Sequence, residues 1–157
     1  MEENKKLNEF LEKNKKSHFL QSPEWAKLKS EWEHEMIVIE ENDEIKGAMS
    51  VLLRKVPVFK RYIMYAPRGF VCDEHDKDTL KKLTEKAKEI AKKYKAFIFR
   101  LDPDISNEDE EFKKIAEEVG YKLKKNIKDI DQVIQPKYVF RLDLSNKTEE
   151  ELLASFN

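Results

Sequence analysis

Apolar positions recur about every three to four residues in several segments of the chain, which is the pattern of helices that bury one face. This pattern predicts helices over residues 3–15, 22–32, 76–94, 107–121 and 146–157. Ser22 suits a helix N-cap and Pro23 suits the first helical position. Thr148 and Glu151 have the spacing of a capping box. The clearest apolar stripe belongs to residues 76–94 and joins Leu80, Leu83, Ala87, Ile90 and Ala91.

Between these helices, apolar residues form the short runs and alternations that are typical of strands. The predicted strands cover residues 35–42, 43–57, 60–71, 95–103, 121–126 and 131–144. The polar, turn-prone connection at residues 41–47 makes a hairpin of the first two strands. The short apolar run at residues 95–103 is typical of a strand at the centre of a sheet with both faces covered.

The order of these elements is two helices, three strands, then helix, strand, helix and strands. This order predicts an α+β or mixed α/β layer fold. A central mixed sheet flanked by helices is compatible with the GNAT-like acyltransferase fold, whose enzymes hold the pyrophosphate of acetyl-CoA on a glycine-rich turn at a helix start. The chain has three glycines and none of them are clustered. We therefore expect that its acyl donor is not CoA bound in that way.

Charge and cysteine content exclude several classes of function. Lys and Arg total 31 and Asp and Glu total 32, so the net charge of −1 gives no overall field that attracts nucleic acid or an anionic membrane. Cys72 is the only cysteine, which excludes an intramolecular disulfide and a CxxC metal site, and the three histidines lack metal-ligand spacing. No apolar run is long enough for a signal peptide or a membrane span. We predict a cytoplasmic protein with no DNA partner and no stable membrane insertion.

The length of 157 residues is that of one domain, and we expect residues 1–157 to form a single domain. The last predicted helix has the apolar stripe Leu152, Leu153 and Phe156, which is still running when the chain ends at Asn157. We interpret the chain as a piece of a longer protein. A short, frayed natural terminus is the alternative.

Four phrases of the sequence carry a resemblance to a known family. They are QSPEWAKLKSEWEHEMIVIEENDEIKGAMSVLLRKVP, YIMYAPRGFVCD, FIFRLDPDI and IQPKYVFRLDLSNKTEEELLASFN. In this order and at this spacing they resemble the Fem family, the peptidoglycan bridge-forming aminoacyltransferases also called the methicillin-resistance or FemABX group. The resemblance covers about residues 19–157.

The resemblance implies transfer of an amino acid from aminoacyl-tRNA to the stem-peptide amine of a cell-wall precursor. The acceptor is either a UDP-linked muramyl pentapeptide or its lipid-linked form. Family members have two GNAT-like subdomains, so this chain would be the first, and the missing C-terminal subdomain would be its partner. No metal or organic cofactor is expected, and the isolated piece is expected to be inactive. Because the donor ester is already activated, positioning and electrostatic stabilisation would supply most of the catalysis.

Two basic residues are candidates for binding the precursor. Trp25, Leu28 and Trp32 form one narrow stripe at about 100° per residue, and we expect both tryptophans to belong to the core. Lys29 lies on the border of this stripe, so its stem can pack while its ammonium meets an anion. In the family a matching lysine contacts the phosphates of the nucleotide-linked precursor; a snorkelling surface lysine is the alternative. Arg68 lies on a turn where the family often has a basic residue, and a guanidinium there can bind carboxylate or phosphate bidentately.

Asp102 is the candidate catalytic residue. It follows an apolar strand, and strand ends are where catalytic groups tend to sit. Stem-peptide amines are protonated at neutral pH, so a base must act before attack on the ester, and the matching aspartate of the family has been considered for this role. The alternative is that Asp102 only starts a turn with Pro103. We expect Cys72 to be structural, and the polarity of a loop explains His75 and its acidic neighbours better than a metal site does.

Two other functions fit the predicted fold. One is a tRNA-dependent aminoacyltransferase that acts on another acceptor, such as a protein N-terminus, and lacks the muramyl site. The other is a non-enzymatic GNAT-like binding module. An exposed apolar patch without a polar pocket beside Lys29 would favour the binding module.

Overall fold

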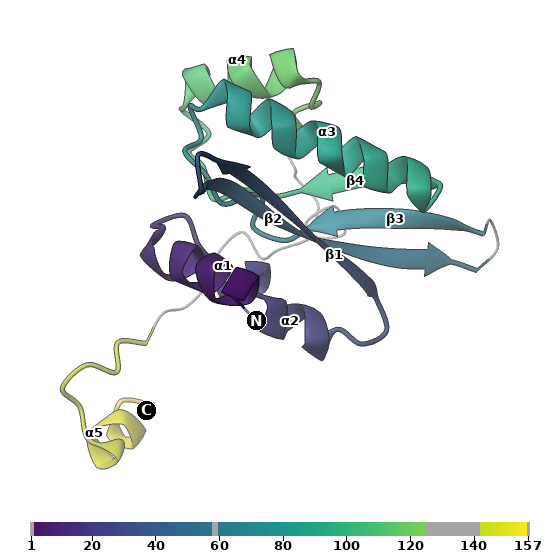
Figure 1. Ribbon diagram of the computed structural model, residues 1–157. Coiled ribbons are helices and arrows are strands. Elements are labelled where there is room, and N and C mark those ends of the chain that lie inside the picture. Colours follow the sequence, from purple (N-terminus) through teal and green to yellow (C-terminus); the bar gives the residue numbers. More distant parts are fainter. Residues whose placement is uncertain (1, 58–59, 125–141, 157) are drawn as a thin grey trace. The chain divides into compact units, whose positions relative to one another are not determined.

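The computed structural model describes residues 2–57, 60–124 and 142–156, with side chains described from residue 5 onward. The chain divides into two compact units, Met1–Lys125 and Asn126–Asn157, and each is described by itself. The described part of the first unit is a four-stranded sheet with helices on both faces (Figure 1). This arrangement confirms the predicted mixed fold class.

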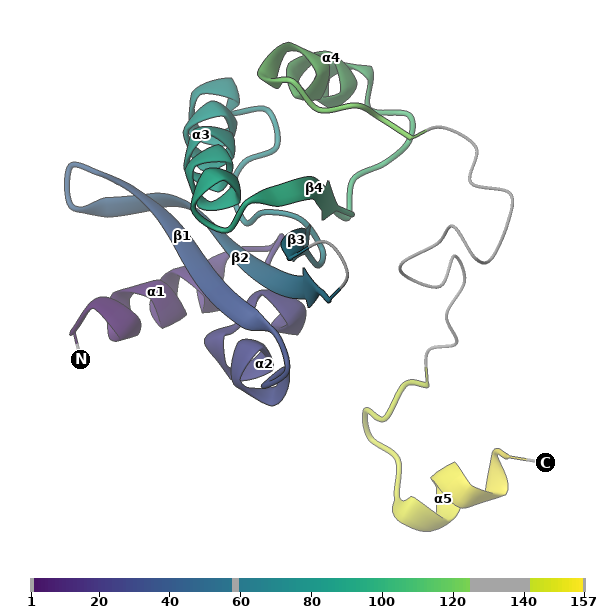
Figure 2. The ribbon, with the colours of Figure 1, turned by 90° about the vertical axis from the view of Figure 1, so that its right-hand side faces the viewer.

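The sheet consists of β1 (Glu33–Glu41), β2 (Glu44–Val56), β3 (Arg61–Ala66) and β4 (Ala96–Leu101), in that spatial order. β1, β2 and β3 form an antiparallel meander, and β4 pairs with β3 in parallel (Figure 2). Asn42 and Asp43 form the tight turn between β1 and β2 with φ angles of 50° and 64°. Asn and Asp adopt such positive φ angles more readily than most residues. The predicted hairpin is therefore confirmed.

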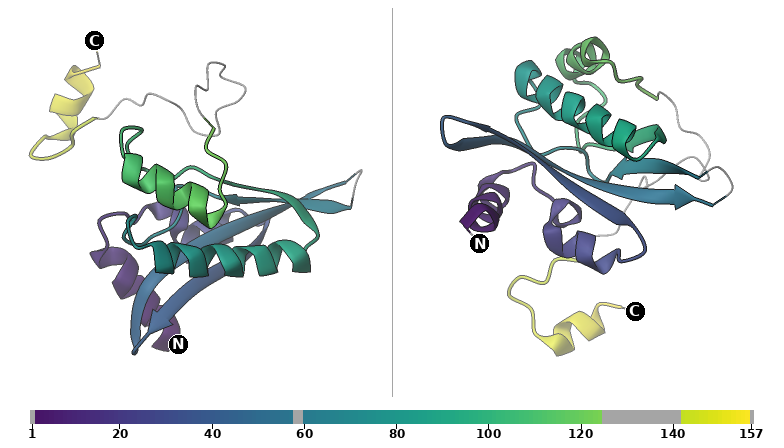
Figure 3. Two further views of the ribbon diagram at one scale, coloured as in Figure 1. Left: turned by 90° about the horizontal axis from the view of Figure 1, so that it is seen from above. Right: turned by 45° about the vertical axis from the view of Figure 1, so that its right-hand side comes forward.

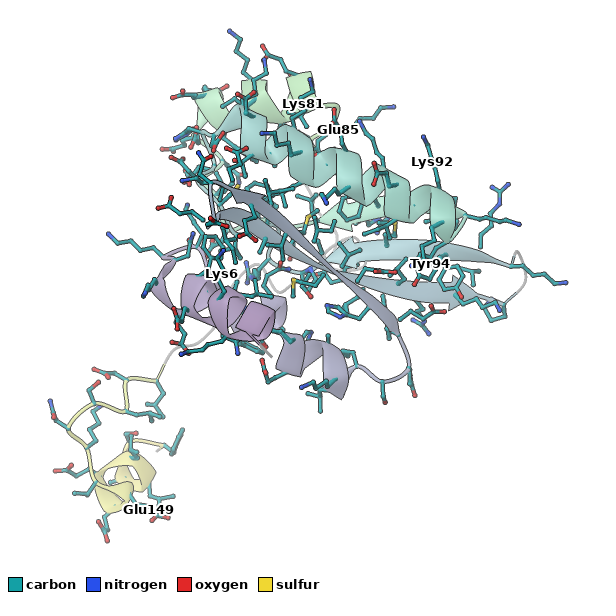
Figure 4. All side chains as sticks on the ribbon, viewed as in Figure 1. Lys6, Lys81, Glu85, Lys92, Tyr94 and Glu149 are labelled. Atoms are coloured by element: carbon teal, nitrogen blue, oxygen red, sulfur yellow. The ribbon has the colours of Figure 1, made fainter. Side chains whose placement is uncertain are left out.

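One face of the sheet is covered by α3 (Lys77–Lys93), which connects β3 to β4, and by α4 (Glu110–Val119), which packs beside α3 (Figures 1 and 3). The predicted stripe of α3 faces the sheet, with Leu80, Leu83 and Ala87 buried. Three exposed polar residues of the same helix point away from the sheet, namely Lys81, Glu85 and Lys92 (Figure 4).

The other face of the sheet carries α1 (Glu2–Lys13), the 3-10 helix η1 (Phe19–Gln21) and α2 (Pro23–Leu28). Leu7 and Leu11 of α1 pack in a second small core with Ala48 of β2. Successive residues of a strand point to opposite faces. Because both faces are covered, seven consecutive residues of β2, from Gly47 to Leu53, are buried.

Three predicted elements differ from the structure in the part of the chain that is described. Ser22 caps α2 as predicted, and its hydroxyl accepts a hydrogen bond from the Trp25 N–H over 3.2 Å, but the helix ends at Leu28 and not at residue 32. No strand forms at residues 121–124. Gly120 ends α4 in the left-handed conformation, and the next residue turns back so that the Thr84 hydroxyl donates to the Tyr121 hydroxyl over 2.9 Å. The strand predicted over residues 131–144 lies outside the described residues except for 142–144, which are not in a strand.

β4 differs from its prediction in its place in the sheet. Among the described residues it pairs only with β3, and the side chain of Phe97 is 52% exposed. The prediction of a central strand with both faces covered is therefore wrong for the described part of the chain. An apolar run indicates a strand that is largely buried, but it does not determine the strand's neighbours.

The described part of the second unit contains α5 (Glu149–Ala154). The Glu151 N–H donates to the Thr148 hydroxyl over 3.3 Å, and the Thr148 N–H donates to the Glu151 carboxylate over 2.9 Å. The predicted capping box is therefore confirmed. Leu153 of this helix and Phe156, which follows it, are exposed.

Candidate functional site

The C-terminal ends of β3 and β4 lie next to each other because these two strands are parallel. β3 is followed by a turn at residues 67–69, and β4 is followed by Asp102 and Pro103. The backbone N–H of Arg68 donates a hydrogen bond to Oδ1 of Asp102 over 3.0 Å. The structure thus brings together two candidate site residues that are 34 positions apart in the sequence.

The turn after β3 has a constrained backbone. Arg68 has a φ of 58° and Gly69 a φ of 83°, both in the left-handed region. A Cβ added to Gly69 would lie 2.6 Å from Cβ of Pro103, so only glycine lets the turn approach the end of β4 this closely. A non-glycine residue in the left-handed region costs about 1–3 kcal/mol and persists only where its surroundings hold it. The contacts to Asp102 and Pro103 supply part of that support.

The carboxylate of Asp102 is partly buried. Its Oδ2 atom is fully buried and has no hydrogen-bond partner of standard geometry within the described residues. Burial raises the pKa of Asp102, while the Arg68 N–H, the Tyr65 hydroxyl and the Arg68 charge act in the opposite direction. A partly buried carboxylate with one available oxygen and a raised pKa can accept a proton from a bound ligand.

The Arg68 side chain also has a buried atom without a partner. Its Nε atom forms no hydrogen bond within the described part of the chain. Buried polar atoms without partners are uncommon because their desolvation is costly. The same site therefore offers one buried donor, on Arg68, and one buried acceptor, on Asp102.

His18 lies close enough to the same pair to be affected by the charges of Arg68 and Asp102, although the sequence pattern does not single it out. Its Nδ1 accepts a hydrogen bond from the Leu20 N–H over 3.2 Å and caps η1, so the neutral ring carries its proton on Nε2. Burial lowers the pKa of His18, and the Arg68 charge adds to this effect, whereas Asp104 and Asp102 oppose it. His18 therefore presents a neutral ring with one N–H donor near the site.

A run of rings leads from His18 to Lys29. The centroids of His18 and Phe19 are 4.7 Å apart, and those of Phe19 and Trp25 are 5.5 Å apart. The Lys29 ammonium lies 4.9 Å from the centroid of the Trp25 ring, within the range of a cation–π contact. Lys29 caps the C-terminal end of α2 and is exposed, so its stem packs on a ring and its charge faces solvent.

The predicted stripe of α2 is not a core. Leu28 is 71% exposed, and Trp25 and Trp32 are only partly buried. The helix ends before Trp32, whose ring instead lies 5.7 Å from the Arg54 guanidinium carbon. The prediction that both tryptophans belong to the core is therefore wrong, because the helical period was extended past the last helical residue. Lys29 makes no ion pair with Asp102 among the described residues, so these two candidates do not contact each other.

Cys72 and His75 take the structural roles that the sequence indicates. Cys72 is 2% exposed, and burial raises its pKa to about 12, so it is a neutral thiol in the core. His75 pairs with Asp109, the N-cap of α4, over 3.0 Å. Within the described residues no three His, Cys, Asp or Glu side chains form a group that could hold a metal ion.

A separate hollow of about 370 Å³ lies at the opposite ends of β3 and β4. Its lining residues are Arg61, Ala91, Lys92, Lys95, Ala96 and Phe97. It contains cations and apolar surface but no acid or base that would serve acyl transfer. The chemistry of the site therefore resides at the other end of these strands, at Arg68 and Asp102.

Comparison with known proteins identifies relatives over the whole chain. The model of the FemAB family matches residues 3–157. The lipid II:glycine glycyltransferase of Staphylococcus epidermidis is 32% identical over 157 aligned positions, which cover 98% of this chain and 38% of that protein. The chain therefore spans less than half the length of this curated relative.

Solved structures give the same picture of the fold. A crystal structure of FemX is 30% identical and superposes with a TM-score of 0.70 over 76% of this chain and 30% of that one. An aminoglycoside acetyltransferase from an uncultured soil metagenomic sample, in complex with trehalose, is 12% identical and has a TM-score of 0.58 over 89% of this chain and 90% of that one. The second likeness concerns the fold alone and confirms the predicted acyltransferase-like architecture.

Among the described helices of the protein, none is both long enough and apolar enough to cross a bilayer.

Proposed function

The chain belongs to the FemAB family, and from this premise we propose that it forms part of an aminoacyltransferase that extends the stem peptide of a peptidoglycan precursor. The name of the Staphylococcus epidermidis relative supports this class of reaction and favours a lipid-linked muramyl pentapeptide as the acceptor over the UDP-linked form. The donor in this proposal is aminoacyl-tRNA, as the family resemblance implies. Because this donor is cytoplasmic, the reaction takes place in the cytoplasm.

We assign this chain to the first GNAT-like subdomain of the enzyme. The relative is more than twice as long as the chain, which supports a second subdomain elsewhere in the full-length protein. That subdomain would complete the precursor site. In this proposal the residues of the present chain supply one wall of the site, and the chain alone is inactive.

The observation that carries the proposal is the environment of Asp102. One carboxylate oxygen accepts a hydrogen bond from the Arg68 N–H, the Tyr65 hydroxyl also favours the charged carboxylate, and Oδ2 is buried with no hydrogen bond of standard geometry to the described residues. In the proposed reaction the Asp102 carboxylate removes a proton from the acceptor ammonium. The free amine then attacks the ester carbonyl, a C–N bond forms and the ester C–O bond breaks. A second proton passes from the nitrogen to the leaving ribose oxygen of the tRNA, and the first is released from Asp102 to water.

Arg68 and Lys29 have binding roles in this proposal. In this proposal the Arg68 guanidinium binds a carboxylate, a phosphate or the acyl carbonyl beside Asp102, and its buried Nε–H, which has no partner among the described residues, supports this role. Lys29, whose stem packs on Trp25 while its ammonium faces solvent, contacts a phosphate of the precursor. A phosphate contact at Lys29 and proton transfer at Asp102 are separate parts of one extended site, consistent with the absence of an ion pair between them among the described residues.

The test is transfer of a radiolabelled amino acid from aminoacyl-tRNA by the full-length protein. Lipid-linked and UDP-linked muramyl pentapeptides are offered in parallel, with a protein bearing a free N-terminus as the third acceptor. We expect label on the lipid-linked form and a large loss of transfer in the Asp102→Asn variant. Label on the UDP-linked form would overturn the choice of acceptor. Label only on the protein, or on none of the three, would overturn the peptidoglycan function.

A further inference from the structure

Gln21 is a polar residue in the interior of the first unit, where it is 1% exposed. It is the last residue of η1, and its carboxamide reaches strand β2 and the turn after β3. Oε1 accepts a hydrogen bond from the Ser50 N–H over 2.8 Å. Nε2 donates to the carbonyl of Pro67 over 2.5 Å and lies 3.4 Å from the carbonyl of Ser50. Every partner of this side chain is a backbone atom.

The two main partners demand an amide at this position. Ser50 offers an N–H and Pro67 offers a carbonyl, so the side chain must both accept and donate. An amide does this in one planar group without having to change its protonation state, and the two partners also fix which amide atom is oxygen and which is nitrogen. An apolar side chain of similar size would leave a backbone donor and a backbone acceptor buried without partners.

The hydrogen bond from Gln21 to Pro67 matters for the candidate site because Pro67 precedes Arg68. Pro67 is the first residue of the turn after β3, and the next backbone N–H, that of Arg68, is the one that donates to Asp102. The carboxamide thus bridges the middle of β2 to a turn that has a left-handed residue at its centre, Arg68 with a φ of 58°. Gly69 packs against Pro103 on the far side of the same turn.

We propose that Gln21 is a positioning residue of the candidate site: its carboxamide holds the Pro67–Arg68 turn against β2 and thereby keeps the Arg68 N–H on the carboxylate of Asp102. Among the described residues, the hydrogen bonds of the Gln21 side chain go to Ser50 and Pro67, and none goes to Asp102. Gln21 acts through the backbone of the turn. The proposal gives a reason for the glutamine in the phrase FLQSPEW that burial alone does not give, since an apolar side chain fills a core equally well.

A purely structural role for Gln21 makes a different prediction. If the amide only satisfies two buried backbone groups, its loss lowers the free energy of unfolding and leaves the ionisation of Asp102 unchanged. If it positions the turn, its loss also weakens the hydrogen bond from Arg68 to Asp102. That hydrogen bond favours the charged carboxylate, so the pKa of Asp102 then rises further above its ordinary value. The ionisation of Asp102 therefore separates the two roles.

The experiment is an NMR titration of the Asp102 carboxyl carbon in this chain, with the resonance assigned by its loss in Asp102→Asn. The test variant is Gln21→Met, which keeps the side-chain length and removes both hydrogen-bonding groups. Gln21→Asn is the second variant. It keeps an amide, but its side chain is one methylene too short to reach both Ser50 and Pro67. Ser50→Ala is the matched control: it removes the hydrogen bond of the Ser50 hydroxyl to His34 and leaves the backbone partners of Gln21 in place.

We expect an upward shift of the Asp102 pKa in both Gln21 variants and a wild-type value in Ser50→Ala, even where that control lowers stability. A wild-type Asp102 pKa in either folded Gln21 variant would overturn the proposal. An equal shift in Ser50→Ala would overturn it too, because loosening of the core would then be the cause.

The proposal rests on the candidate site, and its link to the proposed function has a separate readout. In the full-length enzyme, we expect the acidic limb of the pH profile of kcat to shift to higher pH in Gln21→Met, while KM for the precursor stays the same. If the Asp102 pKa from NMR rises but this limb does not shift, Gln21 remains a positioning residue and the proposal that Asp102 is the base is wrong. An unshifted NMR titration would overturn the positioning role whatever the activity.

Discussion

The imidazole Nε2 of His75 lies 3.0 Å from Oδ2 of Asp109, and this pair joins the loop before α3 to the N-cap of α4. The hydrogen bond to Asp109 raises the pKa of His75, chiefly because it favours the charged ring. The pKa of Asp109 is lowered, first by the Phe112 N–H that it caps and then by His75. The pair is solvent-exposed, so its contribution is small and falls with added salt.

The sign of the pH dependence follows from the raised pKa of His75. The stabilising effect of the charged ring is fully present below the unfolded pKa near 6.5 and is lost as the pH rises through the higher folded pKa. We expect His75→Gln to be less stable than the wild type at pH 6 and equally stable well above the folded pKa of His75. Urea unfolding of both proteins across this range measures the difference. A difference that does not change with pH would show that His75 does not act through its charge.

Substitution of Gly69, in the turn after β3, should lower the stability of the protein strongly. In Gly69→Ala, the new Cβ would meet the side chain and backbone of Pro103 at 2.6 Å and 2.8 Å, and the residue would keep a φ of 83°. We expect the free energy of unfolding to fall by about 2–4 kcal/mol from strain and overpacking together. Gly120→Ala is the matched control, since it also has a positive φ but its Cβ would find only the end of Lys88 at 3.9 Å. It should cost about 1–2 kcal/mol, the cost of a Cβ in the left-handed region, and equal losses at both sites would argue against the close contact with Pro103.

Because Cys72 is buried, we expect its thiol to react only when the protein unfolds. The side chain is 2% exposed and its pKa is about 12, so the native protein at pH 8 holds almost no thiolate at this position. We expect slow alkylation by iodoacetamide in buffer and a steep rise in rate across the urea unfolding transition. The control is Cys72→Ser combined with Ser30→Cys, which moves the thiol to an exposed turn and should react fast without urea. Fast alkylation of native Cys72 would show that this part of the core opens readily.

Much of the local structure follows from short-range sequence signals, and the site follows from them only in part. The caps at Ser22 and Thr148 and the stripe of α3 depend on residues within one or two turns, so spacing alone predicts them. Arg68 and Asp102 were predicted one at a time because each stands next to a strand end. Their hydrogen bond was not predicted, because it depends on the parallel pairing of β3 with β4.

Gln21 and His18 were missed for a related reason. A glutamine before a Ser-Pro helix start has the composition of a polar surface, and nothing nearby in the sequence marks it as buried. Its partner Pro67 is 46 residues away. The error at Trp32 has the opposite origin, since a local period was extended beyond the end of the helix at Leu28. Local periodicity predicts elements, whereas buried polar contacts depend on which elements meet.

Because Lys29 lies at the exposed end of α2, its substitution should weaken precursor binding without lowering stability. Lys29→Ala in the full-length protein should weaken binding of the lipid-linked precursor in nanodiscs by about tenfold or more, the size of a lost hydrogen bond between charged groups. Its thermal midpoint should stay close to that of the wild type, because the side chain is exposed. Lys27→Ala, on the same helix and also exposed, is the control and should bind as the wild type does. Equal weakening by both substitutions would indicate a general effect of charge and not a contact at Lys29.

We expect substitution of Asp102 to have opposite effects on activity and on stability. Burial raises its pKa, so the folded state holds its proton more tightly than the unfolded state does. Stability from this residue is therefore gained as the pH falls through the folded pKa, and the charged form opposes folding at neutral pH. Asp102→Asn removes the charge, while the amide oxygen can still accept the hydrogen bond from the Arg68 N–H. We expect this variant to be at least as stable as the wild type at pH 7.

The same substitution should remove the proton acceptor of the proposed reaction. In the full-length enzyme, kcat for amino acid transfer is expected to fall by about 10²–10⁴-fold, the usual contribution of a general base. Urea unfolding at pH 7 and single-turnover transfer assays on the same preparations measure the two effects together. A variant that is both inactive and clearly less stable would point to a structural role for the carboxylate. A variant that keeps wild-type kcat would show that the base lies elsewhere, because the Asn side chain cannot take a proton from the ammonium at this pH.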